Sequence, residues 1–374
     1  NDGDDLTTDD LGITGIWLMP MFPSQSYHGY DVDDYYAVNP DYGTMEDFQE
    51  FLDEAEARGI SVIIDMTCNH SSIYTDWFIS SRDPDSPYRD WYRWTDGTDP
   101  SYNMKQKIWG HDVWNMDTKT QTYYAGLFQY GMPDFNLANP EVREEFKKIT
   151  SFWLEKGVDG FRFDAAGHVF NSAELPAGEN GQPQAIAFWE ELCGHIASVK
   201  PDAYNVGEVW EPASTRAAYM KGLRSSFHFD LGTVIVDAVR YKDGGQNNLA
   251  NQLSSNYKLY AAQNPDYIDA PFLTNHDQNR ISGMLKGDFS KLKLAASLYI
   301  LAEGVPFMYY GEEIGLMGAK PDEQIRTPML WNTAGKDKMQ TTWIESKYNK
   351  NTIPVKQQEK DETSLLQYYK RLIR

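Results

Sequence analysis

Short apolar runs recur along the chain, and they alternate with stretches in which apolar residues return every three or four positions. The runs are typical of strands buried on both faces of a parallel sheet, and the spaced pattern is typical of helices with one apolar face. The predicted strands are 12–20, 61–65, 160–164, 204–208, 226–230, 270–274 and 305–310. Strands and helices in alternation, joined by short links, predict a right-handed parallel β/α series.

Two of the predicted helices have recognisable ends. Thr44 can cap the first, with Asp47 three residues on as its capping-box partner, and Gly59 stops it. Asn139 can cap the second, which begins with proline and ends at Gly157. These signals make the two helices the best defined in the sequence.

The long stretch between His70 and Asn139 does not fit the β/α series. It is rich in Trp, Tyr, Asp and Gly and shows little helical periodicity. A compact domain rarely contains a structureless loop of such length. We therefore predict a small inserted domain at 71–136, standing over the carboxyl ends of the strands, between the two parts 1–70 and 137–374 of the main domain.

Composition narrows the class of protein. The chain is 41% hydrophobic and 14% aromatic, as expected of one that buries a core. Its formal net charge of −21 opposes contact with a phosphate backbone, so we expect no nucleic-acid partner. No apolar run reaches the roughly 18 residues of a spanning helix, so we expect no membrane-spanning segment. Cys68 and Cys193 make no disulfide framework, and we expect free thiols.

The stretch 160–168 carries the strongest candidate chemistry. Side chains alternate faces in a strand, so Arg162 and Asp164 point one way while Phe161 and Phe163 pack on the other side. A guanidinium next to a carboxylate favours the anion, and an ionised, positioned carboxylate can act as a nucleophile. A purely structural Arg–Asp pair remains the alternative for this stretch alone.

Similar motifs end three other predicted strands, at 65–70, 207–210 and 275–277. In β/α barrels the chemistry lies at the carboxyl ends of the strands. The ordered set of four motifs closely resembles the α-amylase family of glycoside hydrolases, over about Gly12 to Trp331. The stretch 132–136 resembles a short motif of members intermediate between oligo-1,6-glucosidases and neopullulanases.

The resemblance implies a (β/α)8 TIM barrel with the small inserted domain after the third strand. Seven of its eight strands are visible, and the missing one is the first, expected before Asn1. Family members also carry a C-terminal β-sandwich, which we expect after Arg374. The sequence is therefore expected to be an excerpt of a longer protein.

The resemblance also assigns roles to three carboxylates. Asp164 matches the family's nucleophile, Glu208 the general acid, and Asp277 a third acid that binds sugar hydroxyls. We expect the charges of Asp164 and Asp277 to raise the pKa of Glu208. Covalent catalysis with retention needs the carboxyls of Asp164 and Glu208 roughly 5–5.5 Å apart.

Other residues match positions that bind the sugar in the family. His70 and His276 match histidines at the cleavage subsite, and Tyr30 matches an aromatic that stacks on the sugar there. His28 and Asp31 share the loop of Tyr30, and Arg162 supports the nucleophile. A structural histidine or a tyrosine in the core is the alternative for each. Position 167 is glycine, where many α-amylases carry a lysine on the leaving-group side, so binding there must come from elsewhere.

Calcium is the one cofactor that the resemblance suggests, and no organic cofactor is expected. Asn69 matches an asparagine that in many members ligates a structural Ca²⁺, with the carbonyl at position 168. Calcium takes six to eight oxygens, and Asp112 and Asp117 are further acids that could contribute. The alternative is that Asn69 hydrogen-bonds the inserted domain without a metal.

The leading hypothesis is a retaining hydrolase of α-1,4-glucosidic bonds in starch or maltooligosaccharides. The alternatives are an exo-acting α-glucosidase or oligo-1,6-glucosidase, a glucanotransferase, and a non-catalytic carbohydrate-binding relative. We expect a monomer that acts outside the cell or on its surface, because long glucans do not cross membranes.

Overall fold

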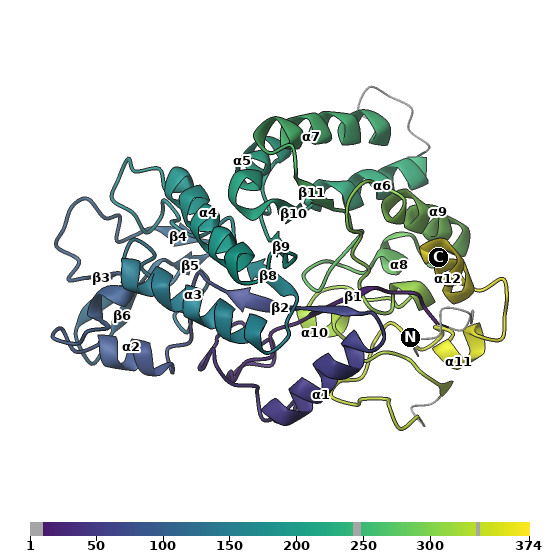
Figure 1. Cartoon of the computed structure of the whole chain (residues 1–374), viewed down its shortest axis with the longest axis horizontal. Coiled ribbons are helices and arrows are strands. Elements are labelled where there is room, and N and C mark those ends of the chain that lie inside the picture. The colour runs from purple at the N-terminus through teal and green to yellow at the C-terminus, as the bar shows by residue number, and fades with distance from the viewer. Residues whose placement is uncertain (1–9, 242–247, 334–336) are drawn as a thin grey trace. The chain divides into compact units, whose positions relative to one another are not determined.

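The computed structural model of the chain describes residues 10–241, 248–333 and 337–374. It divides into two compact units, each described here by itself (Figure 1). The amino-terminal unit consists of Thr14–Trp210 and Ala218–Ser226. The carboxy-terminal unit consists of Asn1–Ile13, Glu211–Ala217 and Phe227–Arg374.

A parallel sheet organises the amino-terminal unit, with the strand order β1-β2-β8-β9-β10. Its strands are β1 (Gly15–Leu18), β2 (Ser61–Thr67), β8 (Gly160–Asp164), β9 (Tyr204–Gly207) and β10 (Ser225–Phe227). The helices between them are α1 (Met45–Glu56), α3 (Pro140–Glu155), α4 (Gln182–Val199) and α5 (Ala213–Leu223), of which the first part, up to Ala217, is assigned to the other unit. The predicted alternation of strand and helix is confirmed in this unit.

The predicted helix caps are present. The Thr44 hydroxyl accepts from the amide of Asp47 at 3.1 Å, and the Asp47 carboxylate accepts from the amide of Thr44 at 2.7 Å. Asn139 accepts from the amide of Glu141 at 2.9 Å. Each cap satisfies amides that have no partner inside the helix, so α1 and α3 begin where the sequence indicates.

Close packing between β8 and β9 depends on a glycine. Gly160 has φ +147°, and a Cβ there would lie 1.9 Å from the carbonyl oxygen of Tyr204. Any larger residue would push the two strands apart. The glycine thus sets the position of β8, which ends at Asp164.

The segment 71–136 is mostly irregular, with short antiparallel strands. It contains α2 (Asp76–Ser81), η1 (Arg89–Trp91), β3 (Trp94–Thr95), β4 (Lys107–Ile108), β5 (His111–Asp112), β6 (Trp114–Asp117) and β7 (Thr122–Ala125). One sheet has the order β3-β7-β6, and β4 pairs with β5 as a separate hairpin. The domain boundaries at 71 and 136 stay a prediction.

The carboxy-terminal unit is mainly helical. Its elements are α6 (Phe229–Tyr241), α7 (Leu249–Gln263), β11 (Ile268–Ala270), α8 (Ile281–Met284), α9 (Phe289–Ile300), η2 (Glu312–Ile314), α10 (Asp322–Ile325), α11 (Val355–Gln358) and α12 (Leu365–Ile373). Buried side chains of α6, α9 and α12 form one apolar core with Leu273 and Ile281.

Strands in this half of the chain are shorter than predicted. The predicted strand 226–230 gives way to α6 at Phe229, and 270–274 is represented by β11, which ends at Ala270. The stretch 305–310 forms only a parallel bridge between Phe307 and Phe272. The amides of Val305 and Phe307 donate to the carbonyls of Asp269 and Pro271. Pro271 and Pro306 have no N–H and cannot donate further hydrogen bonds between the strands, so the pairing ends there.

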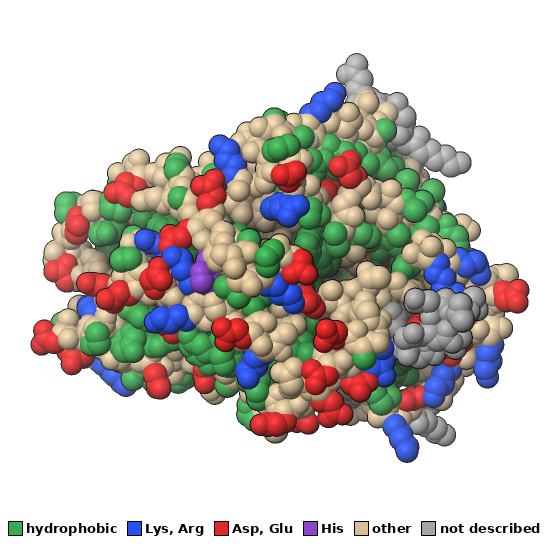
Figure 2. Space-filling view, in the orientation of Figure 1, with side chains coloured by type: hydrophobic (Ala, Val, Ile, Leu, Met, Phe, Trp, Pro, Cys, Tyr) green, Lys and Arg blue, Asp and Glu red, His purple; other side chains and the backbone are tan. Residues whose placement is uncertain are grey.

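Cys68 and Cys193 are free thiols, as predicted. Within the described ranges, the helices are too short or too polar to serve as a membrane span. Figure 2 shows acidic and basic side chains interspersed over the visible face. That no nucleic acid binds stays a prediction.

Candidate active site

Strand register brings an arginine and two acids of neighbouring strands together. Asp65 on β2 pairs directly with Arg162 on β8, and Thr67 pairs with Asp164. Arg162 is fully buried. Its Nη1 lies 2.8 Å from Asp65 Oδ1 and 2.6 Å from Asp164 Oδ1, while its Nη2 lies 2.8 Å from Glu208 Oε2. One guanidinium therefore binds three carboxylates, and we call these four residues the Arg162 cluster.

Arg162 keeps its charge despite its burial. Burial alone disfavours the cation, but Asp65, Tyr30, Glu208 and Asp164 together raise the pKa of Arg162 well above its ordinary value. A permanent cation stabilises the ionised form of Asp164. The physical condition for a carboxylate nucleophile is met at this strand end.

The residue after Asp164 has an unusual backbone conformation. Ala165 has φ 48°, a region that residues other than glycine seldom adopt. Its amide donates to Glu208 Oε2 at 3.0 Å. The left-handed turn thus gives Glu208 a second donor beside Arg162, and such local strain is typical of functional sites.

Asp65 is a buried acid to which sequence reasoning assigned no role. It accepts hydrogen bonds from Trp17 Nε1 at 3.1 Å and from the Tyr30 hydroxyl at 3.2 Å, besides those from Arg162. Burial raises the pKa of Asp65 to about 6, against the lowering effect of Arg162. Its position at the end of the predicted strand 61–65 was a signal, but only the register shows that it faces Arg162.

The loop after β1 holds three of the predicted binding residues. Tyr30 is nearly buried, and its ring lies 5.7 Å from the guanidinium carbon of Arg162 and 6.0 Å from the ring of His28. Asp31 accepts from the hydroxyls of Ser24 and Ser26. Hydrogen bonds within the loop therefore fix Asp31, and contacts with the Arg162 cluster fix Tyr30.

His70 and Asn69 connect β2 to the segment 71–136. Burial lowers the pKa of His70 to about 3, so the ring is neutral near pH 7. Asn69 donates to Asp134 Oδ1 at 2.8 Å, and Leu127 donates its amide to Asp134 Oδ2 at 2.6 Å. Burial raises the pKa of Asp134 well above its ordinary value.

Asp277 and His276 belong to the carboxy-terminal unit. Asp277 Oδ1 lies 3.0 Å from Arg326 Nη2, and its Oδ2 lies 3.1 Å from His276 Nε2. Asn275 accepts from the Asp277 amide at 2.9 Å. We call these four residues the Asp277 cluster. That all three predicted catalytic acids share one cleft stays a prediction, as does the spacing of Asp164 and Glu208.

Comparisons with known proteins show the family of the chain. The model of the alpha amylase catalytic domain matches residues 8–374. The chain is 44% identical to Alpha-amylase 3 of Dictyoglomus thermophilum, over 97% of this chain and 69% of the relative. It is 31% identical to the 4-alpha-glucanotransferase of Thermotoga maritima, over 96% and 78%. The crystal structure of the alpha-amylase from H. orenii superposes with a TM-score of 0.89 at 45% identity, covering 100% of this chain and 74% of that one.

The chain belongs to the α-amylase family. It is thus a glycoside hydrolase of that family, and the predicted (β/α)8 TIM-barrel class is confirmed. Three of the four motifs of this α-amylase-family chain lie at the carboxyl ends of β2, β8 and β9, where a barrel enzyme places its chemistry, and the fourth begins five residues after β11.

The residues predicted for calcium do not gather as a metal site. Asp112 lies 2.9 Å from Lys107, and Asp117 lies 3.0 Å from Arg82. Asn69 is bonded to Asp134. In the described part of the chain, no three His, Cys, Asp or Glu side chains form a group that could hold a metal. These donors do not fit a site of six to eight oxygens, and calcium binding stays a prediction.

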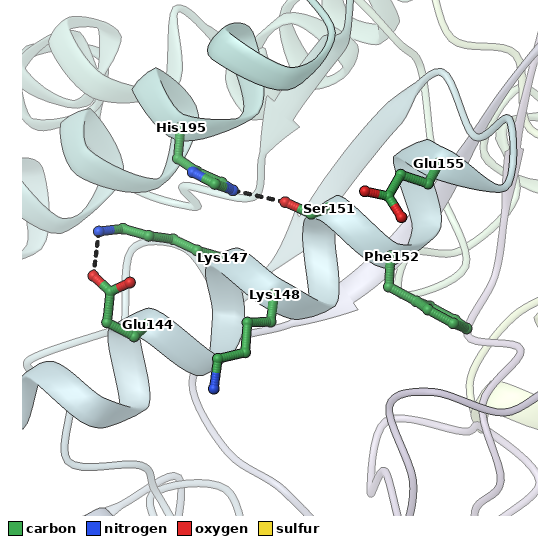
Figure 3. Close-up of a pocket in the computed structure, with 7 residues that line it drawn as sticks. All are labelled: Glu144, Lys147, Lys148, Ser151, Phe152, Glu155 and His195. Atoms are coloured by element: carbon green, nitrogen blue, oxygen red, sulfur yellow. Dashed lines mark hydrogen bonds and ion pairs between the residues drawn. The ribbon is translucent and has the colours of Figure 1, made fainter.

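A hollow of about 300 Å³ lies between α3 and α4 (Figure 3). His195 Nε2 lies 2.8 Å from the Ser151 hydroxyl, and Lys147 lies 2.6 Å from Glu144 and 2.7 Å from Glu191. These polar groups satisfy one another across the two helices. We interpret the hollow as part of the interface between α3 and α4 and assign it no role in the reaction.

Proposed function

We propose that this chain is a retaining hydrolase of α-1,4-glucosidic bonds in starch or maltooligosaccharides. The observation that carries the proposal is the Arg162 cluster, in which one buried cation binds both Asp164 and Glu208. Glycoside cleavage with retention needs an ionised nucleophile and a proton donor close together. The Arg162 cluster provides two carboxylates bound to the same guanidinium. Asp164 ends β8, and Glu208 directly follows the neighbouring strand β9.

The proposed reaction has two steps. Asp164 attacks the anomeric carbon, forming an ester bond, while the glycosidic bond breaks and Glu208 gives its proton to the leaving oxygen. Water then attacks the same carbon, Glu208 takes a proton from the water, and the ester bond breaks to regenerate Asp164. Two inversions retain the α configuration. Asp277 is proposed to bind hydroxyls of the reacting sugar.

Replacing Asp164 tests the nucleophile. Asp164→Asn removes the attacking anion but keeps the shape, so we expect activity on soluble starch to fall by about 10⁴-fold. Asp159→Asn is a matched control, because Asp159 precedes the same strand and pairs with Lys200 at 2.6 Å. A slow glycosyl fluoride substrate should label a peptide containing Asp164, detected by mass spectrometry. If Asp164→Asn hydrolysed starch as fast as wild type, Asp164 would not be the nucleophile and the proposal would be wrong.

Transfer to a sugar acceptor is the second candidate function. A relative named 4-alpha-glucanotransferase, 31% identical, favours it. Hydrolysis and transfer share the ester intermediate and differ only in whether water or a sugar attacks it. Product chromatography separates them: shortened maltooligosaccharides indicate internal hydrolysis, glucose alone indicates end-wise cleavage, and lengthened chains indicate transfer. Soluble starch, pullulan and isomaltose tested side by side give the linkage preference.

We further propose that the enzyme works as a monomer outside the cell or on its surface. The reason is physical, because polymeric glucans cannot cross a membrane to reach an internal enzyme. Starch-degrading activity in washed cells and culture medium, compared with lysate, tests the location. Light scattering of the purified protein tests the monomer.

A further inference from the structure

Trp109 is an exposed aromatic residue at the tip of the β4–β5 hairpin. Its side chain is 60% exposed, and its φ of 49° is left-handed. Gly110 follows with φ 88°, so the pair forms a two-residue turn that normally takes Asn-Gly or Asp-Gly. A bulky residue in this conformation is a true outlier. Backbone strain of this kind clusters at functional sites.

The Trp109 ring extends a row of aromatic rings that begins at His70. The His70 ring lies 5.0 Å from that of Phe128, and Phe128 stacks on Trp109 at 5.3 Å with 30° between the planes. His168 meets Trp109 edge-on at 5.2 Å and Phe128 at 5.7 Å. We call these four residues the aromatic row. Exposure rises along it, from 1% at His70 to 60% at Trp109.

The row runs beside the proposed proton donor. The Gly167 amide donates to the backbone oxygen of Glu208 at 3.1 Å, and His168 follows directly. The charge of Glu208 acts on His168, although burial makes the larger contribution and lowers the pKa of His168. His168 thus lies within the electrostatic reach of Glu208 and in ring contact with Trp109, which places Trp109 one residue away from the proposed proton donor.

Packing of the hairpin alone does not account for Trp109. The apolar anchor of the hairpin is Ile108, which packs with Val113, Trp114, Ala125 and Leu127. Stacking on Phe128 uses one face of the indole and leaves a flat apolar surface in water. Flat aromatic faces of this kind suit the apolar faces of sugar rings.

We propose that Trp109 binds a sugar ring on the leaving-group side by stacking, and so sets the preference for long chains and for sugar acceptors. The assignment rests on the proposed function. Gly167 presents no side chain next to Glu208, and a Cβ there would make only ordinary contacts, 3.5 Å from Val209. Trp109 thus supplies contact area on a side where position 167 supplies none.

The test compares two substrates that differ only on the leaving-group side. Maltoheptaose offers sugars there, whereas maltotriosyl fluoride offers a single fluoride. We expect Trp109→Ala to lower kcat/KM on maltoheptaose by about tenfold and on the fluoride by less than about twofold. Trp109→Tyr keeps a stacking ring and should recover most of the loss. With maltose added, Trp109→Ala should also form less transfer product from the fluoride.

Tyr42→Ala is the matched control, because Tyr42 is 61% exposed and is not one of the rings that form the aromatic row. This substitution should leave kcat/KM on both substrates unchanged. Equal losses of Trp109→Ala on both substrates, or none on either, would overturn the assignment while leaving the proposed function intact. A wild type that cleaves neither substrate would overturn the proposed function and this assignment with it. Unchanged thermal midpoints exclude misfolding.

Discussion

The two acidic clusters that carry the predicted chemistry are held in different ways. In the amino-terminal unit, one fully buried arginine binds Asp65, Asp164 and Glu208. In the carboxy-terminal unit, Asp277 is 28% exposed and pairs with Arg326, which also lies 3.4 Å from Asp322. The first cluster shares one cation among three acids whose side chains are at most 14% exposed, whereas the second pairs a more exposed acid with an arginine from a distant part of the chain.

The difference teaches which charges the fold itself maintains. Buried charges cost much free energy unless they are paired, and removing one partner leaves the others uncompensated. A partly exposed acid keeps water as an alternative partner, so its pairing contributes less. Asp164 therefore depends on its arginine, whereas Asp277 is expected to tolerate the loss of Arg326.

The largest expected effect comes from removing each arginine in turn. Arg162→Met leaves three acids without their shared cation, and we expect the free energy of unfolding to fall by about 3–5 kcal/mol. Arg326→Met should lower the free energy of unfolding by only about 1 kcal/mol. Urea unfolding at pH 7, followed by circular dichroism, measures both. Equal losses would show that the two clusters do not differ in this way.

A third buried acid sharpens the comparison because no arginine pairs with it in the described contacts. Glu312 accepts from the Tyr299 hydroxyl at 2.9 Å and from the Tyr369 hydroxyl at 2.6 Å. Burial raises the pKa of Glu312 to about 7. The folded state therefore binds this proton more tightly than the unfolded state, and stability falls as pH rises from about 4.5 through 7.

Glu312→Gln should remove this pH dependence. The amide oxygen of the glutamine can still accept a hydrogen bond from a tyrosine hydroxyl. Between pH 4.5 and pH 8 the unfolding free energy of wild type should therefore fall by on the order of 3 kcal/mol more than that of the variant. Unfolding free energies across that range provide the measurement. Glu359→Gln, an exposed change, is the control. If the unfolding free energy of Glu312→Gln fell with rising pH as steeply as that of wild type, Glu312 would not be the source of the pH dependence.

A smaller effect than that of Arg162 is expected at Asn69, which donates a hydrogen bond to the buried acid Asp134. Asn69→Ala deprives Asp134 of one donor and should cost about 1–2 kcal/mol. Chelation with EDTA should leave the thermal midpoint and the activity of wild type unchanged, because the nearby donors are already engaged. A midpoint that drops with EDTA and returns with calcium would instead confirm the calcium prediction.

Much of the fold was readable from local pattern, and the exceptions have local causes. The caps at Thr44 and Asn139 and the strand at β8 follow from residues within a few positions of each other. Strand 305–310 was overestimated because apolar content says nothing of the missing N–H at Pro271. Short strands of the segment 71–136 carry too few residues for a periodic signal.

By itself, the sequence determined the order of the four motifs and the shared face of Arg162 and Asp164, because both depend on neighbouring positions along one strand. Only the tertiary structure decided that Asp65 faces Arg162, that Asn69 meets Asp134, and that Trp109 stacks on Phe128. These contacts join residues far apart in the chain. They depend on strand register and turn geometry, and a slip of one residue would turn every side chain of a strand to the opposite face.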